Sequence, residues 1–218
     1  MAEKPARRTP VIRLAISVEG PTEGEFVKHF LANHLWEKGV VPTPIPLGSA
    51  RGGSAGGNVS AERLVREMSH LRHSFNAVTS LVDFYGFRRK GDKTVDELEE
   101  DLRQKLGHPW YPEKVIPYVQ RHEFEGLLFS DVSVFAGLIE APEGSVEALQ
   151  KIRSQFQTPE DINDNKDTAP GKRIKKVIPQ YDKKVNAPLL AIEIGLDKIR
   201  TECPRFNDWV RSLESLGS

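Results

Sequence analysis

Three things are scarce in this chain of 218 residues: cysteine, long apolar runs and net charge. The single cysteine, Cys203, excludes a disulfide framework and a cysteine-based zinc site, and is typical of a reducing cytosol. No apolar run approaches the roughly 18 residues that a membrane helix needs. The 31 basic residues balance the 31 acidic ones, so no global charge draws the chain to nucleic acid or to a membrane. We therefore expect a soluble cytoplasmic protein with no membrane partner.

The length allows one sizeable hydrophobic core. Residues 1–10 open with a polar and basic stretch that has no apolar segment, so we interpret them as a disordered leader and not as a secretory signal. We predict a single domain over 11–218, divided into an α/β core at 11–121 and a helical extension at 122–218. A loop rich in glycine and serine, at 48–58, is expected to be mobile.

Strand patterns and helix patterns alternate in the first half of the chain. Segments rich in β-branched and apolar residues lie at 11–18, 40–47, 77–83 and 114–119. The second of them carries three prolines, which favours an edge position. Helical patterns with capping residues separate these segments. The alternation predicts a mostly parallel central sheet flanked by helices on both faces, followed by helices from His122 onward.

Two of the apolar strands run directly into an acid, namely Glu19 and Asp83. A carboxylate at the end of a buried strand is costly unless it binds a cation or holds a catalytic proton. In open parallel sheets, ligands bind outside the carboxyl ends of the strands. Glu23, in the first turn of the next helix, is expected to face the same crevice. Three carboxylates favour Mg²⁺ or Mn²⁺ over zinc. The alternative is that Glu19 caps the helix and Asp83 caps a turn.

Longer motifs add specificity to this pattern. The stretch VEG with an acid three residues after its glycine resembles the first motif of the Toprim fold, which topoisomerases, bacterial primases, RNA-maturation nucleases and the nuclease half of overcoming-lysogenization-defect proteins share. The later motifs VDFYG, HEFEGLLFSD, EDIN, TAPGKRI and IGLDKIRTECPRF resemble a bacterial Toprim-like family of unknown function, domain-of-unknown-function family 4276. This resemblance covers nearly the whole chain after Pro10, in the same order.

The resemblance implies a Toprim-like fold and roles for single residues. Glu19 matches the Toprim glutamate, which is a metal ligand or a general base. Glu23 matches the second acid of the nuclease type, and Asp83 matches the first aspartate of an Asp-x-Asp pair. The second position of that pair is Tyr85, which departs from the pattern because it is not an acid.

The natural substitutes for the missing acid are Glu123 and Glu125 in the HEFE motif. We expect only one of the two to enter the site, favouring Glu125. His122 could carry a proton near neutral pH, and the alternative is that it is a structural residue.

Basic residues concentrate between Lys166 and Lys184. Such a cluster is typical of phosphate contacts, and its alternative is a solvated helix face. The TAPGKRI resemblance favours the first interpretation. Lys172 or Arg173 is then expected to act in catalysis, by stabilising the charge that develops on a phosphoryl group.

The leading hypothesis is a nuclease dependent on Mg²⁺ or Mn²⁺ that cleaves phosphodiester bonds of DNA or RNA. The resemblance further implies a place in phage defence beside an ABC-type ATPase partner. One alternative is a non-catalytic Toprim-like binding or regulatory module for such an ATPase, with Tyr85 marking lost catalysis. Another is nucleotidyl transfer or phosphate hydrolysis on small nucleotides. The oligomeric state is left open by the sequence.

Overall fold

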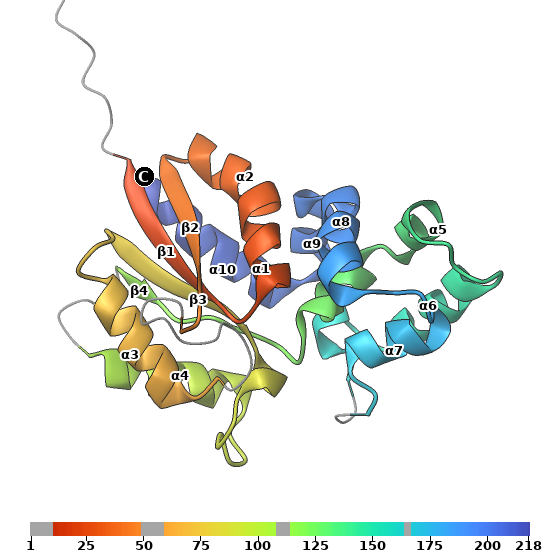
Figure 1. Ribbon diagram of the computed structural model, residues 1–218, viewed down its shortest axis with the longest axis horizontal. Coiled ribbons are helices and arrows are strands. Elements are labelled where there is room, and N and C mark those ends of the chain that lie inside the picture. The colour runs from red at the N-terminus through yellow and green to blue at the C-terminus, as the bar shows by residue number, and fades with distance from the viewer. Residues whose placement is uncertain (1–10, 49–58, 108–113, 164–166) are drawn as a thin grey trace, which may run out of the picture.

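A parallel sheet forms the centre of the molecule in the computed structural model, which describes residues 11–48, 59–107, 114–163 and 167–218. Its strand order is β2-β1-β3-β4, and β5 pairs with β3 further along (Figure 1). Every pairing between these strands is parallel. The strands are β1 (Ile12–Val18), β2 (Val40–Pro46), β3 (Ala77–Asp83), β4 (Val115–Ile116) and β5 (Val119–Gln120). The predicted α/β class is confirmed.

Two strand predictions gain detail from the structure. The single strand expected at 114–119 is divided into β4 and β5 around Pro117, which has no N–H to offer a ladder. The proline-rich β2 lies at the edge, as expected. Leu47 N donates to Val18 O (2.9 Å), and alternate residues of a strand point the same way. The missing N–H groups of Pro42, Pro44 and Pro46 therefore face outward, away from β1.

Helices cover both faces of the sheet (Figure 1). One face packs on a continuous helical run made of α1 (Pro21–Phe26), a π-helical turn (Val27–Leu31) and α2 (Ala32–Glu37). The other packs on α3 (Ala61–Leu71) and α4 (Val95–Leu106). The alternation of β1 explains this arrangement. Leu14, Ile16 and Val18 join the first apolar cluster, and Ala15 joins the second.

The C-terminal half is almost entirely helical. Its 3-10 helices are Phe124–Ser130, Val132–Val134, Pro159–Asp161 and Ser215–Gly217. Its α-helices are α5 (Phe135–Leu138), α6 (Ser145–Arg153), α7 (Pro170–Val177), α8 (Lys183–Ile194), α9 (Leu196–Glu202) and α10 (Pro204–Glu214). Helices α5, α6 and α7 lie to one side of the sheet, at the right of Figure 1. In the part of the chain that the structure describes, no helix is long and apolar enough to cross a bilayer.

The last helix, α10, returns to the sheet. Trp209 Nε1 donates to Thr79 Oγ1 on β3 (2.9 Å), and the Trp209 ring stacks on Tyr118 at 4.7 Å between centroids. Phe206 and Leu213 of the same helix share an apolar cluster with β1. The hydrophobic core thus crosses the expected boundary at residue 121, and that boundary stays a prediction from the sequence. The predicted leader at 1–10 and most of the loop at 48–58 lie outside the described residues.

Candidate functional site

The first two predicted acids lie at neighbouring strand ends. Glu19 directly follows β1, and Asp83 is the last residue of β3, which is the parallel neighbour of β1. Asp83 Oδ1 accepts from Phe124 N (2.8 Å), so this carboxylate ties β3 to the distant HEFE motif. Glu19 Oε2 is buried without a hydrogen-bond donor and lies against Gly86. A side chain at position 86 would fill the place that the Glu19 carboxylate occupies.

The third acid, Glu23, lies in the first turn of α1. Gly20 is the N-cap of this helix, and its N–H donates to Glu23 Oε2 (3.0 Å). The capping alternative for Glu19 is therefore wrong, because the helix begins with Gly20 and the side chain that returns to it belongs to Glu23. Glu23 is 4% exposed. Glu23 and Glu19 both lie close enough to Asp83 for its negative charge to raise their pKa values.

Both acids of the HEFE motif border the same site. The chain is extended at Glu123 and enters a 3-10 helix at Phe124, so Glu125 belongs to a helical turn. Glu123 Oε2 accepts from Gly171 N at the start of α7 (3.1 Å). A Cβ at Gly171 would lie 2.8 Å from Glu125 Oε1 and 3.2 Å from Glu123 Oε2. The expectation that only one of the two acids enters was wrong, and the glycine of the TAPGKRI motif lets α7 approach both.

The structure adds a lysine that sequence reasoning left inside the general basic cluster. Lys183 is the first residue of α8, and α8 packs on α1. Lys183 Nζ lies 2.8 Å from Glu125 Oε2, 3.1 Å from Asp83 Oδ2 and 3.8 Å from Glu23 Oε1. Its ammonium group is thus the cation at the centre of the carboxylates. In the sequence, Lys183, which points into the site, differs from the exposed Lys184 only in its position directly after the N-cap residue Asp182.

Six residues make up the site, and we name them the carboxylate–lysine cluster: Glu19, Glu23, Asp83, Glu123, Glu125 and Lys183.

Burial and like charge govern protonation in this cluster. Burial, and then the charge of Asp83, raise the pKa of Glu19 and of Glu23 to about 7. Burial raises the pKa of Glu125 to about 7 against the opposing pull of Lys183, and it also raises the pKa of Glu123. Burial alone would lower the pKa of Lys183, but Asp83, Glu125 and Glu23 together hold it well above its usual value. Without a further cation, the cluster therefore retains protons near neutral pH.

Lys172 and Arg173, the predicted catalytic cations, lie in α7 at the border of the cluster. Lys172 is 56% exposed and pairs with Asp167 (3.1 Å). Its charge partly opposes the burial that raises the pKa of Glu123. Arg173 Nε donates to Thr168 O (2.6 Å), and its guanidinium lies over the Phe156 ring. The contacts of Lys172 and Arg173 thus differ from those of Lys183, which touches the carboxylates directly. Their catalytic role stays a prediction.

Tyr85 and His122 lie beside the cluster and contact each other. Their ring centroids are 5.6 Å apart, and Asn163 Nδ2 contacts the Tyr85 hydroxyl and His122 Nδ1. Burial, together with the charge of Arg121, lowers the pKa of His122 to about 4. His122 is therefore neutral at pH 7, which supports its structural reading over that of a proton carrier. Tyr85, in the place of the missing acid, holds this neutral assembly together.

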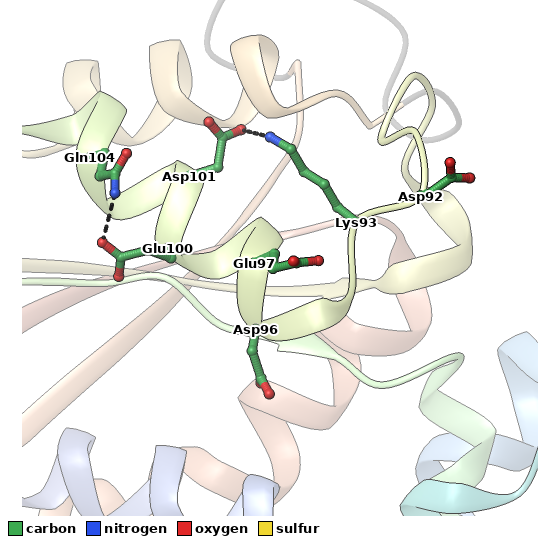
Figure 2. Close-up of a pocket in the computed structure, with 7 residues that line it drawn as sticks. All are labelled: Asp92, Lys93, Asp96, Glu97, Glu100, Asp101 and Gln104. Carbon is green, nitrogen blue, oxygen red and sulfur yellow. Dashed lines mark hydrogen bonds and ion pairs between the residues drawn. The ribbon is translucent and has the colours of Figure 1, made fainter.

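A second acidic region lies on α4, apart from the cluster. Asp92, Asp96, Glu97, Glu100 and Asp101 line an open hollow of about 800 Å³ with Lys93 and Gln104 (Figure 2). Lys93 pairs with Asp101 (2.9 Å), and Gln104 donates to Glu100 (3.1 Å). Asp92, Asp96, Glu97 and Glu100 are exposed, as is typical of a solvated helix face.

The donor set of the cluster fits a hard divalent cation. Carboxylate oxygens are the ligands that Mg²⁺ and Mn²⁺ prefer, and Glu19 Oε2 is buried without a donor. In the conformation described, no three acidic, histidine or cysteine side chains among the described residues are placed to hold a metal ion. The ammonium of Lys183 lies between the oxygens of Asp83, Glu125 and Glu23 instead. Metal binding would therefore require the Lys183 side chain to move out of the cluster or the carboxylate side chains to change rotamer.

No curated protein matches the chain in sequence. Among solved structures, the mercury-phased C-terminal region of the Xanthomonas campestris pv. campestris OLD protein is 15% identical, with a TM-score of 0.45 over 94% of this chain and 93% of that chain. The platinum-phased form of the same region is 16% identical, with a TM-score of 0.44 over 94% and 91%. The model of the family described as Domain of unknown function (DUF4276) matches residues 18–214. The chain belongs to the DUF4276 family.

Proposed function

We propose that this protein is a phosphodiesterase that cleaves nucleic acid with Mg²⁺ or Mn²⁺. The observation that carries the proposal is that five carboxylates from four separate segments gather around Lys183 and Asp83 at the carboxyl ends of parallel strands. Stability alone does not account for such a cluster, because burying like charges together is costly. Strand ends of this kind are where open parallel sheets bind their ligands.

The carboxylates Glu19, Glu23, Asp83, Glu123 and Glu125 would hold the metal. A divalent ion bound there supplies Lewis-acid activation of water and of the phosphoryl oxygen. Glu19, with its pKa near 7 in the metal-free protein, is placed to accept a proton at neutral pH. Lys183, whose ammonium lies among these oxygens, would neutralise one oxygen of a phosphate bound at the cluster.

Cleavage of labelled single-stranded and double-stranded DNA and RNA tests the proposal. With Mg²⁺ or Mn²⁺ the unaltered protein should cleave at least one of them, and Glu19→Gln, which keeps the shape and removes the charge, should lower the rate at least 100-fold. Glu100→Gln, on the solvated face of α4, is the matched control and should cleave at the normal rate. Equal rates for Glu19→Gln and Glu100→Gln would refute the assignment.

A second function is favoured by a specific observation, namely that Lys183 already compensates the carboxylates without a metal. Together with Tyr85 in place of an acid, this supports a non-catalytic module that partners an ABC-type ATPase in phage defence. Titration calorimetry with Mn²⁺ separates the two functions. Heat of binding that Glu19→Gln abolishes supports the enzyme, and no binding at millimolar Mn²⁺ supports the regulatory module.

A further inference from the structure

A cavity of about 360 Å³ lies directly behind the strand ends that carry the cluster. It opens between the turn after β3, the start of α4 and the start of α10, and its walls include Phe84, Val95, Arg121, His122 and Arg205. Volumes of this order are usual for small-ligand sites. The cavity is therefore large enough for one flat heterocycle with part of its sugar.

Two wall residues of the cavity are chain neighbours of cluster carboxylates. Phe84 follows Asp83, and His122 precedes Glu123. The Phe84 and His122 side chains line the cavity, whereas the Asp83 carboxylate contacts Lys183 and the Glu123 carboxylate contacts Gly171. One step along the chain therefore leads from a wall residue of the cavity to a carboxylate of the cluster, at 83–84 and again at 122–123. A ligand in the cavity would lie next to the cluster.

The aromatic wall is fixed in position. His122 has a φ of 64°, a left-handed conformation that residues other than glycine adopt rarely. Three contacts hold it there: His122 O accepts from Tyr85 N (3.1 Å), its ring lies beside the Tyr85 ring, and Asn163 Nδ2 is 3.3 Å from Nδ1. Lys90 Nζ lies 4.4 Å from the centroid of the Phe84 ring. The rings are therefore held in place before any ligand binds.

The charges around the cavity indicate a neutral ligand. Arg121 pairs with Asp161 (2.7 Å), and Arg205 pairs with Asp96 and Glu99. Asp92 and Asp96 also line the cavity, so its cations are balanced by acids and a phosphate would gain little there. An aromatic wall with paired donors and acceptors suits a nucleobase, which combines a stacking face with a hydrogen-bonding edge.

We propose that this cavity binds the base of a single-stranded nucleotide next to the phosphodiester bond that the cluster cleaves. The inference rests on the proposed function for the position of that bond, but the binding of a base does not require cleavage. In the loop that follows Phe84, the exposed Arg88 and Arg89 supply positive charge for the adjoining phosphates.

Binding without metal tests the inference separately from cleavage. A labelled ten-nucleotide single strand, as DNA and as RNA, is titrated with the whole protein in EDTA, together with a series in which one base at a time is removed. Loss of the bound base should weaken binding about fivefold or more, since stacking contributes ~1–3 kcal/mol per base. Phe84→Leu should remove this difference, and Phe84→Tyr should keep it. Trp36→Leu, at an exposed aromatic on α2, is the control and should also keep it.

The outcomes separate the two proposals. Equal affinity for every member of the abasic series would overturn the base site even if the protein cleaves. A base-dependent affinity in a protein that never cleaves would support the base site and refute the nuclease. Should Phe84→Leu fail to fold in a thermal melt, the abasic series on the unaltered protein still decides, because it needs no variant.

Discussion

Two acidic regions of the same molecule differ in almost every physical respect. In the carboxylate–lysine cluster, the Glu125 side chain is 4% exposed, whereas Asp96 on α4 is 81% exposed. Burial raises the pKa of Glu125 to about 7, whereas cations from Lys93 and Lys105 lower the pKa of Asp101. The solvated face hydrates its charges and the cluster cannot. The pKa of an acid in this molecule therefore depends on its burial more than on its residue type.

Removing the cation of Lys183 should have the largest effect on the stability of the protein, because it acts on the buried acids and not on the solvated ones. Lys183→Met leaves buried carboxylates without their partner, and at pH 8 in EDTA it should lower the free energy of unfolding by about 2–3 kcal/mol, less than for a fully buried pair because Lys183 is partly exposed. Urea denaturation measures this. Added Mn²⁺ should restore more stability to the variant than to the unaltered protein. Lys184→Met, one residue outward, is the control, and equal losses for both variants would contradict the central role of Lys183.

Crowding the cluster from α7 should have the next largest effect. Gly171→Ala places a methyl group within 2.8 Å of Glu125 Oε1, so this carboxylate must move. We expect Mn²⁺ affinity, measured by calorimetry, to fall about 10-fold to 100-fold, as for other changes that reorient ligands. Gly137→Ala in α5 meets no atom within 4 Å and should leave affinity unchanged. An unchanged affinity in Gly171→Ala would place the metal elsewhere.

The pH dependence of stability should separate the buried acids of the cluster from the exposed acids of α4. Glu19, Glu23 and Glu125 titrate near 7 when folded, against an ordinary value of 4.5, so the folded state binds more protons between these values. The stability they contribute is full below about pH 4.5 and is lost as pH rises through 7. His122, with its lowered pKa, opposes this trend only below about pH 6.5. In EDTA, Tm should therefore fall by on the order of 5 °C from pH 6.5 to pH 8. A Tm that stays constant or rises would contradict the raised pKa values.

The smallest effect is expected on the solvated face. Glu100 is 56% exposed and lies 3.7 Å from Arg103, a pair of little energetic consequence. Glu100→Gln should change the free energy of unfolding by less than about 0.5 kcal/mol and should leave the pH profile as it is. A larger change, measured by the same urea titrations, would show that α4 shares in the electrostatics of the cluster.

The local parts of this fold could be predicted from the sequence. Apolar runs marked β1 and β3, prolines marked β2 as an edge, and the acids after two strands marked the crevice, because each signal lies within a few residues of its consequence. The long motifs then identified Glu123 and Glu125. These predictions needed only chain periodicity and the rule that parallel strands end at one edge.

The parts that failed depend on contacts between distant segments. Lys183 meets Asp83 from 100 residues away, and the sequence offers no periodicity that separates it from Lys184. The entry of both HEFE acids follows from a 3-10 helix at Phe124, whose apolar residues suggested only a helix of some kind. The aromatic wall was hidden because Tyr85 stood out only as a missing acid, and its partners His122 and Asn163 lie 37 and 78 positions further on.

The proline edge of β2 determines how this molecule can meet other proteins. A strand from another chain extends a sheet through alternating N–H and C=O groups, and on the outer side of β2 three of the donors are replaced by proline rings. From Pro42 onward that edge offers acceptors only and is a poor template for an added strand. The opposite side ends in strands of two residues, β4 and β5, which are too short to align one. Among the described residues, neither edge of this sheet is therefore suited to the addition of a strand from a partner protein.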